Sequence, residues 1–127
     1  MTQSAHTDNM SVWVTFQVEG THCYPQALTD PSLVDVAFLG HPHRHVFHFE
    51  VELSVDHDDR DVEFILLKRE LLSLYNGVMS ADSQSCEMMA KKLAAYIDSA
   101  YPGKLITIKV SEDGENGATL RRKYHEY

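Results

Sequence analysis

The sequence predicts an α+β fold in the order β-β-α-α-β-β, with an antiparallel sheet and two helices on one of its faces. Apolar and polar residues alternate in two N-terminal segments and again in two C-terminal segments, which is the period of a strand. Between these, two segments repeat apolar residues at the spacing of a helix. Strands grouped on either side of consecutive helices indicate that both helices cover the same face of one sheet.

The length and charge of the chain narrow its class. Its 127 residues suit one domain, which we expect over residues 11–127 after a disordered tail over 1–10. The formal charge of −8 argues against a nucleic-acid partner, which needs clustered Lys and Arg. No segment has the pattern of a signal peptide or a membrane span, so we expect a cytoplasmic protein without a membrane partner.

The first two strands are expected over 12–22 and about 44–55. The apolar face of the first ends at His22, and the apolar face of the second begins beside His43 and His45. The connection between the two strands contains three prolines and no clear period. It is long for a loop in a small domain, and such loops are usually functional or disordered.

The two helices are expected over about 62–75 and 85–100, and the last two strands over 104–112 and about 118–125. Asn76-Gly77 is a stop signal for the first helix, and Ser83 or Ser85 can cap the second. The predicted core face of the first helix consists of Phe64, Leu67, Leu71, Leu74 and Tyr75. That of the second consists of Cys86, Met89, Ala90, Leu93, Ala94 and Ile97.

Three of the eight histidines, His22, His43 and His45, fall on the apolar faces of the first two strands. If these strands pair as an antiparallel hairpin, the three rings converge at one end of the core. Three histidine nitrogens with an open fourth position are typical of a catalytic Zn²⁺ site, and we expect one here. The alternative is that the rings bond locally or lie exposed. His41 and His48 do not fit the cluster and are expected at the surface.

Glu112 ends the apolar run of its strand, where its carboxylate could accept two hydrogen bonds from the N–C–N edge of a heterocycle. Taken alone, Glu112 is better explained as a solvated residue before a polar turn. Cys23 adjoins His22 and could supply a thiolate near a metal, although an ordinary loop cysteine is slightly favoured. Cys86 is expected in the core.

Five segments, in this order, resemble the motifs of one family. Phe16 to His22 resembles a first-strand segment that ends in a zinc ligand, with a longer spacing than usual. His43 to Val51 resembles His-Gly-His followed by an aromatic residue and Val-Glu-Val. The others are Asp61 to Lys68, similar to Val-x-Asp-Phe-x-x-Leu-Lys; Ser85 to Ala90, similar to Thr-Ser-Glu-Asn-Leu-Ala; and Val110 to Ala118, similar to Val-x-Glu-Thr with a later Asn and Ala. The chain thus resembles the 6-pyruvoyl-tetrahydropterin and 6-carboxy-tetrahydropterin synthases, which have the tunnelling fold, or T-fold.

The resemblance implies that His22, His43 and His45 bind zinc and that Glu112 binds the amino-pyrimidine edge of a pterin. It implies a lyase acting on 7,8-dihydroneopterin triphosphate or a related pterin, by triphosphate elimination or side-chain conversion. In this family zinc polarises the side-chain hydroxyls, while a cysteine and an Asp-His pair move protons. It also implies a homo-oligomer, in which trimers close a barrel and stack into hexamers with sites between subunits.

The chain departs from the family at the proton-transfer groups. Leu39 stands where the catalytic cysteine is expected, and the segment between the helices lacks the Asp-His pair. Asp56-His57 has the same letters but is expected on the order of 35 Å from His45. Cys23 is then the candidate for a displaced catalytic group. Two functions stay open: a divergent zinc-dependent pterin enzyme, and a protein that binds a pterin-like or purine-like ligand without catalysis. The retained open zinc position favours the enzyme. A third, a metal-binding T-fold protein that serves only assembly, is disfavoured by the histidines and Glu112.

Overall fold

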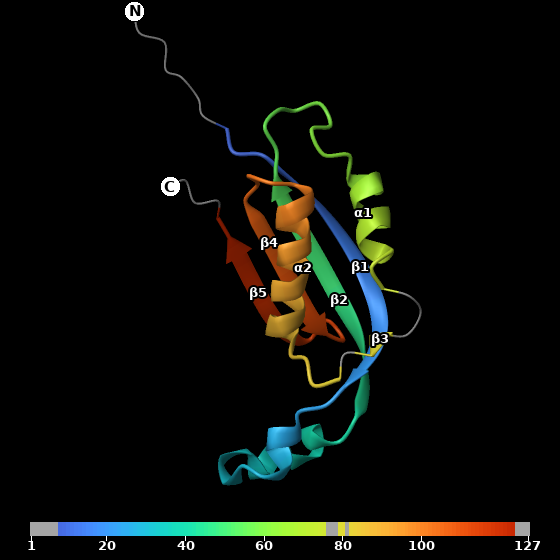
Figure 1. Ribbon diagram of the computed structural model, residues 1–127, viewed down its shortest axis with the longest axis vertical. Coiled ribbons are helices and arrows are strands. Elements are labelled where there is room, and N and C mark those ends of the chain that lie inside the picture. The colour runs from blue at the N-terminus through green and yellow to red at the C-terminus, as the bar shows by residue number, and fades with distance from the viewer. Residues whose placement is uncertain (1–7, 76–78, 81, 124–127) are drawn as a thin grey trace, which may run out of the picture.

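The computed structural model describes residues 8–75, 79–80 and 82–123, and its chain forms one mixed sheet with helices packed on it (Figure 1). In chain order, the elements are β1 (Ser11–His22), the 3₁₀ segments η1 (Pro25–Leu28) and η2 (Pro31–Gly40), β2 (His43–Ser54), α1 (Phe64–Leu72), β3 (Met79–Ser80), α2 (Cys86–Ala100), β4 (Ile106–Glu112) and β5 (Asn116–Arg122). The predicted α+β class is confirmed. Residues 1–7 of the predicted tail lie outside the described part of the chain.

The strand order across the sheet is β3-β1-β2-β4-β5. The four long strands pair antiparallel, but the short β3 runs parallel to the end of β1, so the prediction of an all-antiparallel sheet is wrong. Gly20 permits this approach: a Cβ atom there would lie 2.9 Å from the carbonyl oxygen of Met79 and 3.0 Å from the ring of Phe47. β3 therefore lies at the same end of the sheet as the histidines.

Both helices cover one face of the sheet, as predicted, because the buried residues of the helices and strands form a single cluster. Figure 1 shows α2 across the sheet and α1 beside β1. Phe16 and Phe49 stack in the middle of this core with ring centroids 4.9 Å apart. Two bonds join the helices, since Glu70 accepts from the hydroxyls of Tyr96 at 2.9 Å and Tyr101 at 2.8 Å.

The helices differ from the prediction mainly at α1. It begins at Phe64 and not near residue 62, because the side chain of Glu63 caps it by accepting from two backbone N–H groups. Leu67 and Leu71, one turn apart, are fully buried, whereas Phe64 is 51% exposed and Leu74 is 40% exposed. The part of α1 that packs on the core is thus smaller than the set of apolar residues predicted to do so. The whole apolar stripe predicted for α2 is buried, and Ser85 is its N-cap. Asn76-Gly77 lies outside the described residues.

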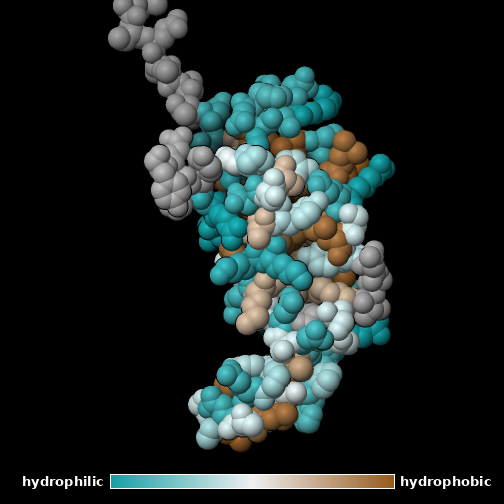
Figure 2. Space-filling view, viewed as in Figure 1, coloured by the Kyte–Doolittle hydropathy of each residue, from teal (hydrophilic) through white to brown (hydrophobic). Residues whose placement is uncertain are grey.

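The long connection after β1 forms η1 and η2, which project from the end of the sheet (Figure 1). Within it only Ala27 and Gly40 are buried. The space-filling view shows hydrophobic surface on this projection at the lower end of the molecule (Figure 2). Leu28, Val34 and Phe38 there are each more than half exposed. An apolar surface of this kind is unusual for a segment that contacts only water.

The last two strands begin at Ile106 and Asn116, which shifts both from their predicted starts. Lys104 precedes β4, and its ammonium group forms ion pairs with Asp56 and Asp61 beyond the end of β2. The predicted end of the last strand, near His125, lies outside the described residues. Among those residues, no helix combines the length and the apolar character needed to cross a membrane.

Candidate metal centre

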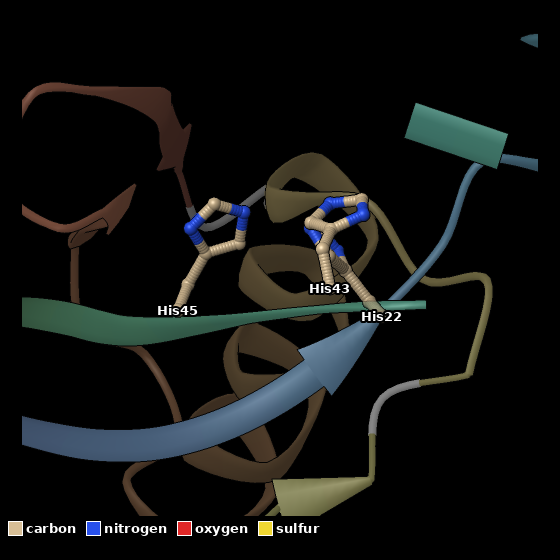
Figure 3. Close-up of side chains that lie close together, drawn as sticks. All are labelled: His22, His43 and His45. Carbon is tan, nitrogen blue, oxygen red and sulfur yellow. The ribbon is translucent and has the colours of Figure 1, made fainter. Parts of the chain in front are cut away.

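The register of β1 and β2 brings the three predicted histidines together. His22 lies opposite His43, and Gly20 opposite His45, so all three rings stand at one end of the same sheet face. Ring centroids are 4.7 Å apart for His22 and His43, 4.9 Å for His43 and His45, and 5.3 Å for His22 and His45. Figure 3 shows His22 at the end of β1 and the other two rising from β2 on the side of α2.

The Nδ1 atom of each ring is already held by a group that can only accept a hydrogen bond. The three contacts are His22 to the carbonyl of Gln84 at 2.8 Å, His43 to the carbonyl of His41 at 2.8 Å, and His45 to a carboxylate oxygen of Asp113 at 2.7 Å. Each Nδ1 must therefore carry the proton, which leaves a lone pair on Nε2 in the neutral ring. This is the tautomer in which histidine binds a metal through Nε2.

Glu112 completes the cluster from β4, where it pairs with Phe47 of β2. One of its carboxylate oxygens lies 3.2 Å from Nε2 of His22, and the other lies 3.4 Å from Nε2 of His45. Nε2 of His45 is buried and has no hydrogen-bond partner. Lone pairs on nitrogen thus face a carboxylate with no donor between them. A positive charge at this point, a metal ion or protons on the rings, relieves that repulsion.

The donor set fits a metal ion. One ring nitrogen from each histidine lies within 4.8 Å of the others. Nitrogens bound to one tetrahedral zinc ion at about 2.0–2.1 Å are about 3.4 Å apart, so the nitrogens need to approach one another by up to about 1.4 Å. Small side-chain rotations supply such a shift. His22 is 8% exposed, while His43 and His45 are half-buried, so the nitrogens are shielded but remain reachable from one side.

A cavity of about 440 Å³ opens beside the cluster and is the natural place for a ligand. It is lined by His22, Cys23, Tyr24, Leu39, His43, Ser83, Gln84, Ser85, Cys86, Glu87, Glu112, Asn116 and Gly117. Two of the three histidines, His22 and His43, therefore share one space with Glu112, both cysteines and the first turn of α2. Imidazole ligands with an accessible side and an adjacent carboxylate suit Lewis-acid chemistry or recognition of a polar heterocycle.

The structure places the two cysteines at this cavity in different ways. Cys23 is half-buried, and its N–H donates to the carbonyl of Asp82 at 2.8 Å. It is not one of the residues whose donor atoms converge on the metal position. Cys86 is buried, as predicted, but it also lines the cavity. Burial, with the charges of Glu112 and Glu87, raises the pKa of the Cys86 thiol to about 11, so it stays protonated at neutral pH.

His41, His48 and the Asp56-His57 pair are not part of the cluster. His41 is exposed, and His48 is half-buried on the opposite face of β2, so neither belongs to the cluster. Asp56 and His57 follow the far end of β2, away from His43. Sequence reasoning missed Asp113 and the carbonyl of Gln84. The Asp-Gly turn signal places Asp113 in a turn, but its role depends on a register that the sequence does not specify.

No family model and no curated protein matches the chain.

Proposed function

We propose that the chain is a zinc-dependent, pterin synthase-like protein with the T-fold, in which His22, His43 and His45 bind Zn²⁺. One observation carries the proposal: three clustered imidazoles each keep a free Nε2 lone pair, and the Glu112 carboxylate lies against two of these nitrogens, those of His22 and His45, with no hydrogen-bond donor between them. Three imidazoles leave a tetrahedral ion one open position, which is the pattern of catalytic zinc. When bound, zinc would supply a Lewis acid for a substrate oxygen.

Glu112 is the proposed recognition residue for the heterocycle. It lines the cavity, and its carboxylate is about a quarter exposed, so it is open to a ligand. The amino-pyrimidine edge of a pterin presents two N–H donors side by side, which match the two oxygens of a carboxylate. This pairing orients the ring and leaves the side chain of the pterin near the histidines. The proposed reaction is of the carbon–oxygen lyase type on 7,8-dihydroneopterin triphosphate or a related pterin.

Cys23 is the proposed proton carrier. It adjoins His22 in sequence and lines the same cavity. A positive ion at the histidines would lower the pKa of a nearby thiol and favour the thiolate that abstracts a proton. Cys86 suits this role less, because its surroundings hold it in the thiol form.

The alternative is a protein that binds a pterin-like or purine-like ligand without turnover. Leu39 favours this reading, since an apolar side chain lines the cavity where the family has its catalytic cysteine. The described residues that line the cavity also include no aspartate to pair with a histidine base. Both functions use the metal ion and Glu112 to bind the ligand, and they differ in whether the bound ligand is converted.

We also propose a homo-oligomer, a trimer or hexamer, with sites between subunits. In the described part of the chain, β3 covers the outer side of β1 only at Gly20 and Thr21, and the opposite edge of the sheet is β5. Edge strands left open favour pairing with another copy, and barrel closure removes both edges. The apolar projection around Phe38 offers a second contact surface. Light scattering at micromolar concentration is expected to give a trimer or hexamer, and a monomer would contradict it.

Calorimetry and turnover assays on the wild-type protein test the proposed function. We expect the zinc-loaded protein to bind a pterin and to convert 7,8-dihydroneopterin triphosphate. Binding without conversion of this compound or its dephosphorylated forms would refute the enzyme and support the binding protein. Absence of both zinc and pterin binding would refute both.

A further inference from the structure

Asp113 holds the ring of His45 in the orientation and tautomer that a metal ligand needs. Oδ2 accepts from Nδ1 of His45 at 2.7 Å, and Oδ1 accepts from the backbone N–H of Val46 at 2.9 Å. The backbone N–H of Asp113 donates in turn to the carbonyl of Val46 at 2.8 Å. One residue at the start of the β4–β5 turn is therefore bonded to β2 at three points.

This geometry arises where the ladder between β2 and β4 ends. The last regular pair is Phe47 with Glu112, and the chain then turns with Asp113 at a φ of 57°. Since this left-handed backbone cannot continue the ladder, the Asp113 carboxylate takes the place of a backbone carbonyl opposite Val46. The second carboxylate oxygen remains free to face His45. Aspartate is among the few residues other than glycine that adopt this conformation at low cost.

The three histidines differ in what holds them. Backbone carbonyls of Gln84 and His41 hold two of the rings, whereas a charged side chain holds His45. A carboxylate that accepts from the distal nitrogen of a ligand histidine fixes its tautomer and increases the basicity of the other nitrogen. The nitrogen that benefits here is the buried Nε2 of His45, which has no hydrogen-bond partner.

We infer that Asp113 is a positioning residue for the metal centre, one that sets the tautomer of His45 and strengthens its bond to the ion. The inference rests on the proposed zinc site, but the tautomer can be measured without metal. Asp113 is neither a residue of the cavity lining nor one of the three ligands, and its side chain reaches the cluster through the bond to His45.

The test compares Asp113→Asn with Asp113→Gly, both of which tolerate a positive φ and should preserve the turn. In Asp113→Asn the amide oxygen can keep the bond from the Val46 N–H, which turns the NH₂ group toward His45. That donor then favours a His45 ring protonated on Nε2, the nitrogen that would bind the metal. Asp113→Gly removes both acceptors. Asp59→Asn, at an exposed residue beyond the far end of β2, is the control for the lost charge.

Two measurements are made on each variant. Chelator competition should show zinc affinity about 10- to 100-fold weaker in both Asp113 variants and unchanged in Asp59→Asn. Nitrogen-15 NMR of the metal-free protein, at a pH where imidazoles are neutral, should show His45 protonated on Nδ1 in the wild type and on Nε2 in Asp113→Asn. Circular dichroism checks that each variant is folded.

The outcomes separate this inference from the proposed function. A folded Asp113→Asn protein with wild-type zinc affinity and an unchanged His45 tautomer would overturn the role of Asp113 while leaving zinc binding intact. If the wild type binds no zinc, the proposed function fails. The NMR result then still decides whether Asp113 sets the tautomer of His45.

Discussion

Glu112 of β4 faces His22 of β1 across the intervening strand β2, with a carboxylate oxygen 3.2 Å from Nε2 of the imidazole. The imidazole already donates through its other nitrogen to Gln84, so this contact joins two acceptors unless a cation lies between them or the ring is protonated. The pair links the proposed metal site to the proposed recognition residue. Changes at Glu112 should therefore affect ligand binding strongly.

Replacement of Glu112 by glutamine tests recognition. The amide keeps one acceptor and loses the charge, so one charge-assisted hydrogen bond of roughly 1.5–3 kcal/mol is lost. We expect pterin affinity to weaken by about 10- to 100-fold in calorimetry. Glu115→Gln makes the same charge change in the adjacent turn, outside the cavity, and should bind like the wild type. Unchanged affinity in Glu112→Gln would mean that the pterin pocket lies elsewhere.

Cys23 separates the two functions. If it carries the proton, Cys23→Ala should lower the turnover rate by about 10²-fold or more, while pterin binding changes little. Cys86→Ala is the matched comparison, because it removes the other thiol of the cavity. Single-turnover kinetics measure the chemical step in both. A Cys23→Ala enzyme with the wild-type rate would exclude Cys23 as the carrier.

Because only part of the apolar surface of α1 packs on the core, substitutions of a buried and an exposed residue of this helix should differ in their effect on the free energy of unfolding. Leu71 is fully buried, so Leu71→Ala should lower the free energy of unfolding by about 2–5 kcal/mol. Phe64 begins the same helix but is 51% exposed, and Phe64→Ala should change the free energy by only about 0.5 kcal/mol. Urea denaturation measures both. Equal losses would mean that the first turn of α1 packs on the core.

Acid should weaken the ion pair between Lys104 and Asp61, at the end of the sheet opposite the histidines. Hydrogen bonds from Lys104 and from the backbone N–H of Asp56 hold the pKa of Asp61 below its usual value of 3.8. The stabilisation from Asp61 is therefore complete above that pH, and it is lost as the pH falls through the lower, folded-state pKa. The stability difference between wild type and Asp61→Asn should vanish in strong acid. A stability difference that stays constant into strong acid would contradict a stabilising role for the ion pair.

Much of the fold and the cluster could be predicted because the decisive patterns are local. Alternation in β1 and β2 determines which residues share a face, and antiparallel pairing then brings His22 to His43. The helical stripe of α2 likewise predicted its buried residues. These features need only the period of each element and one pairing.

The rest depends on contacts between distant segments. The parallel pairing of β3 involves two residues and the space above Gly20, which no periodicity reveals. The role of Asp113 requires the register of β2 against β4 and a turn with positive φ. The apolar pattern predicts Phe64 in the core, but Phe64 is 51% exposed, because such a pattern does not specify how much of a helix its neighbours cover. Likewise, only the sheet as a whole shows that, among the described residues, β3 pairs with just Gly20 and Thr21 of β1.

Zinc content is the most direct test of the central claim. Elemental analysis of the purified protein should give about one zinc ion per chain in the wild type and almost none in His43→Ala, because two imidazoles hold the ion far less tightly than three. His48→Ala removes a histidine from the opposite face of β2 and should keep the full zinc content. A wild-type protein without zinc, or a His43→Ala protein that retains it, would contradict the metal centre.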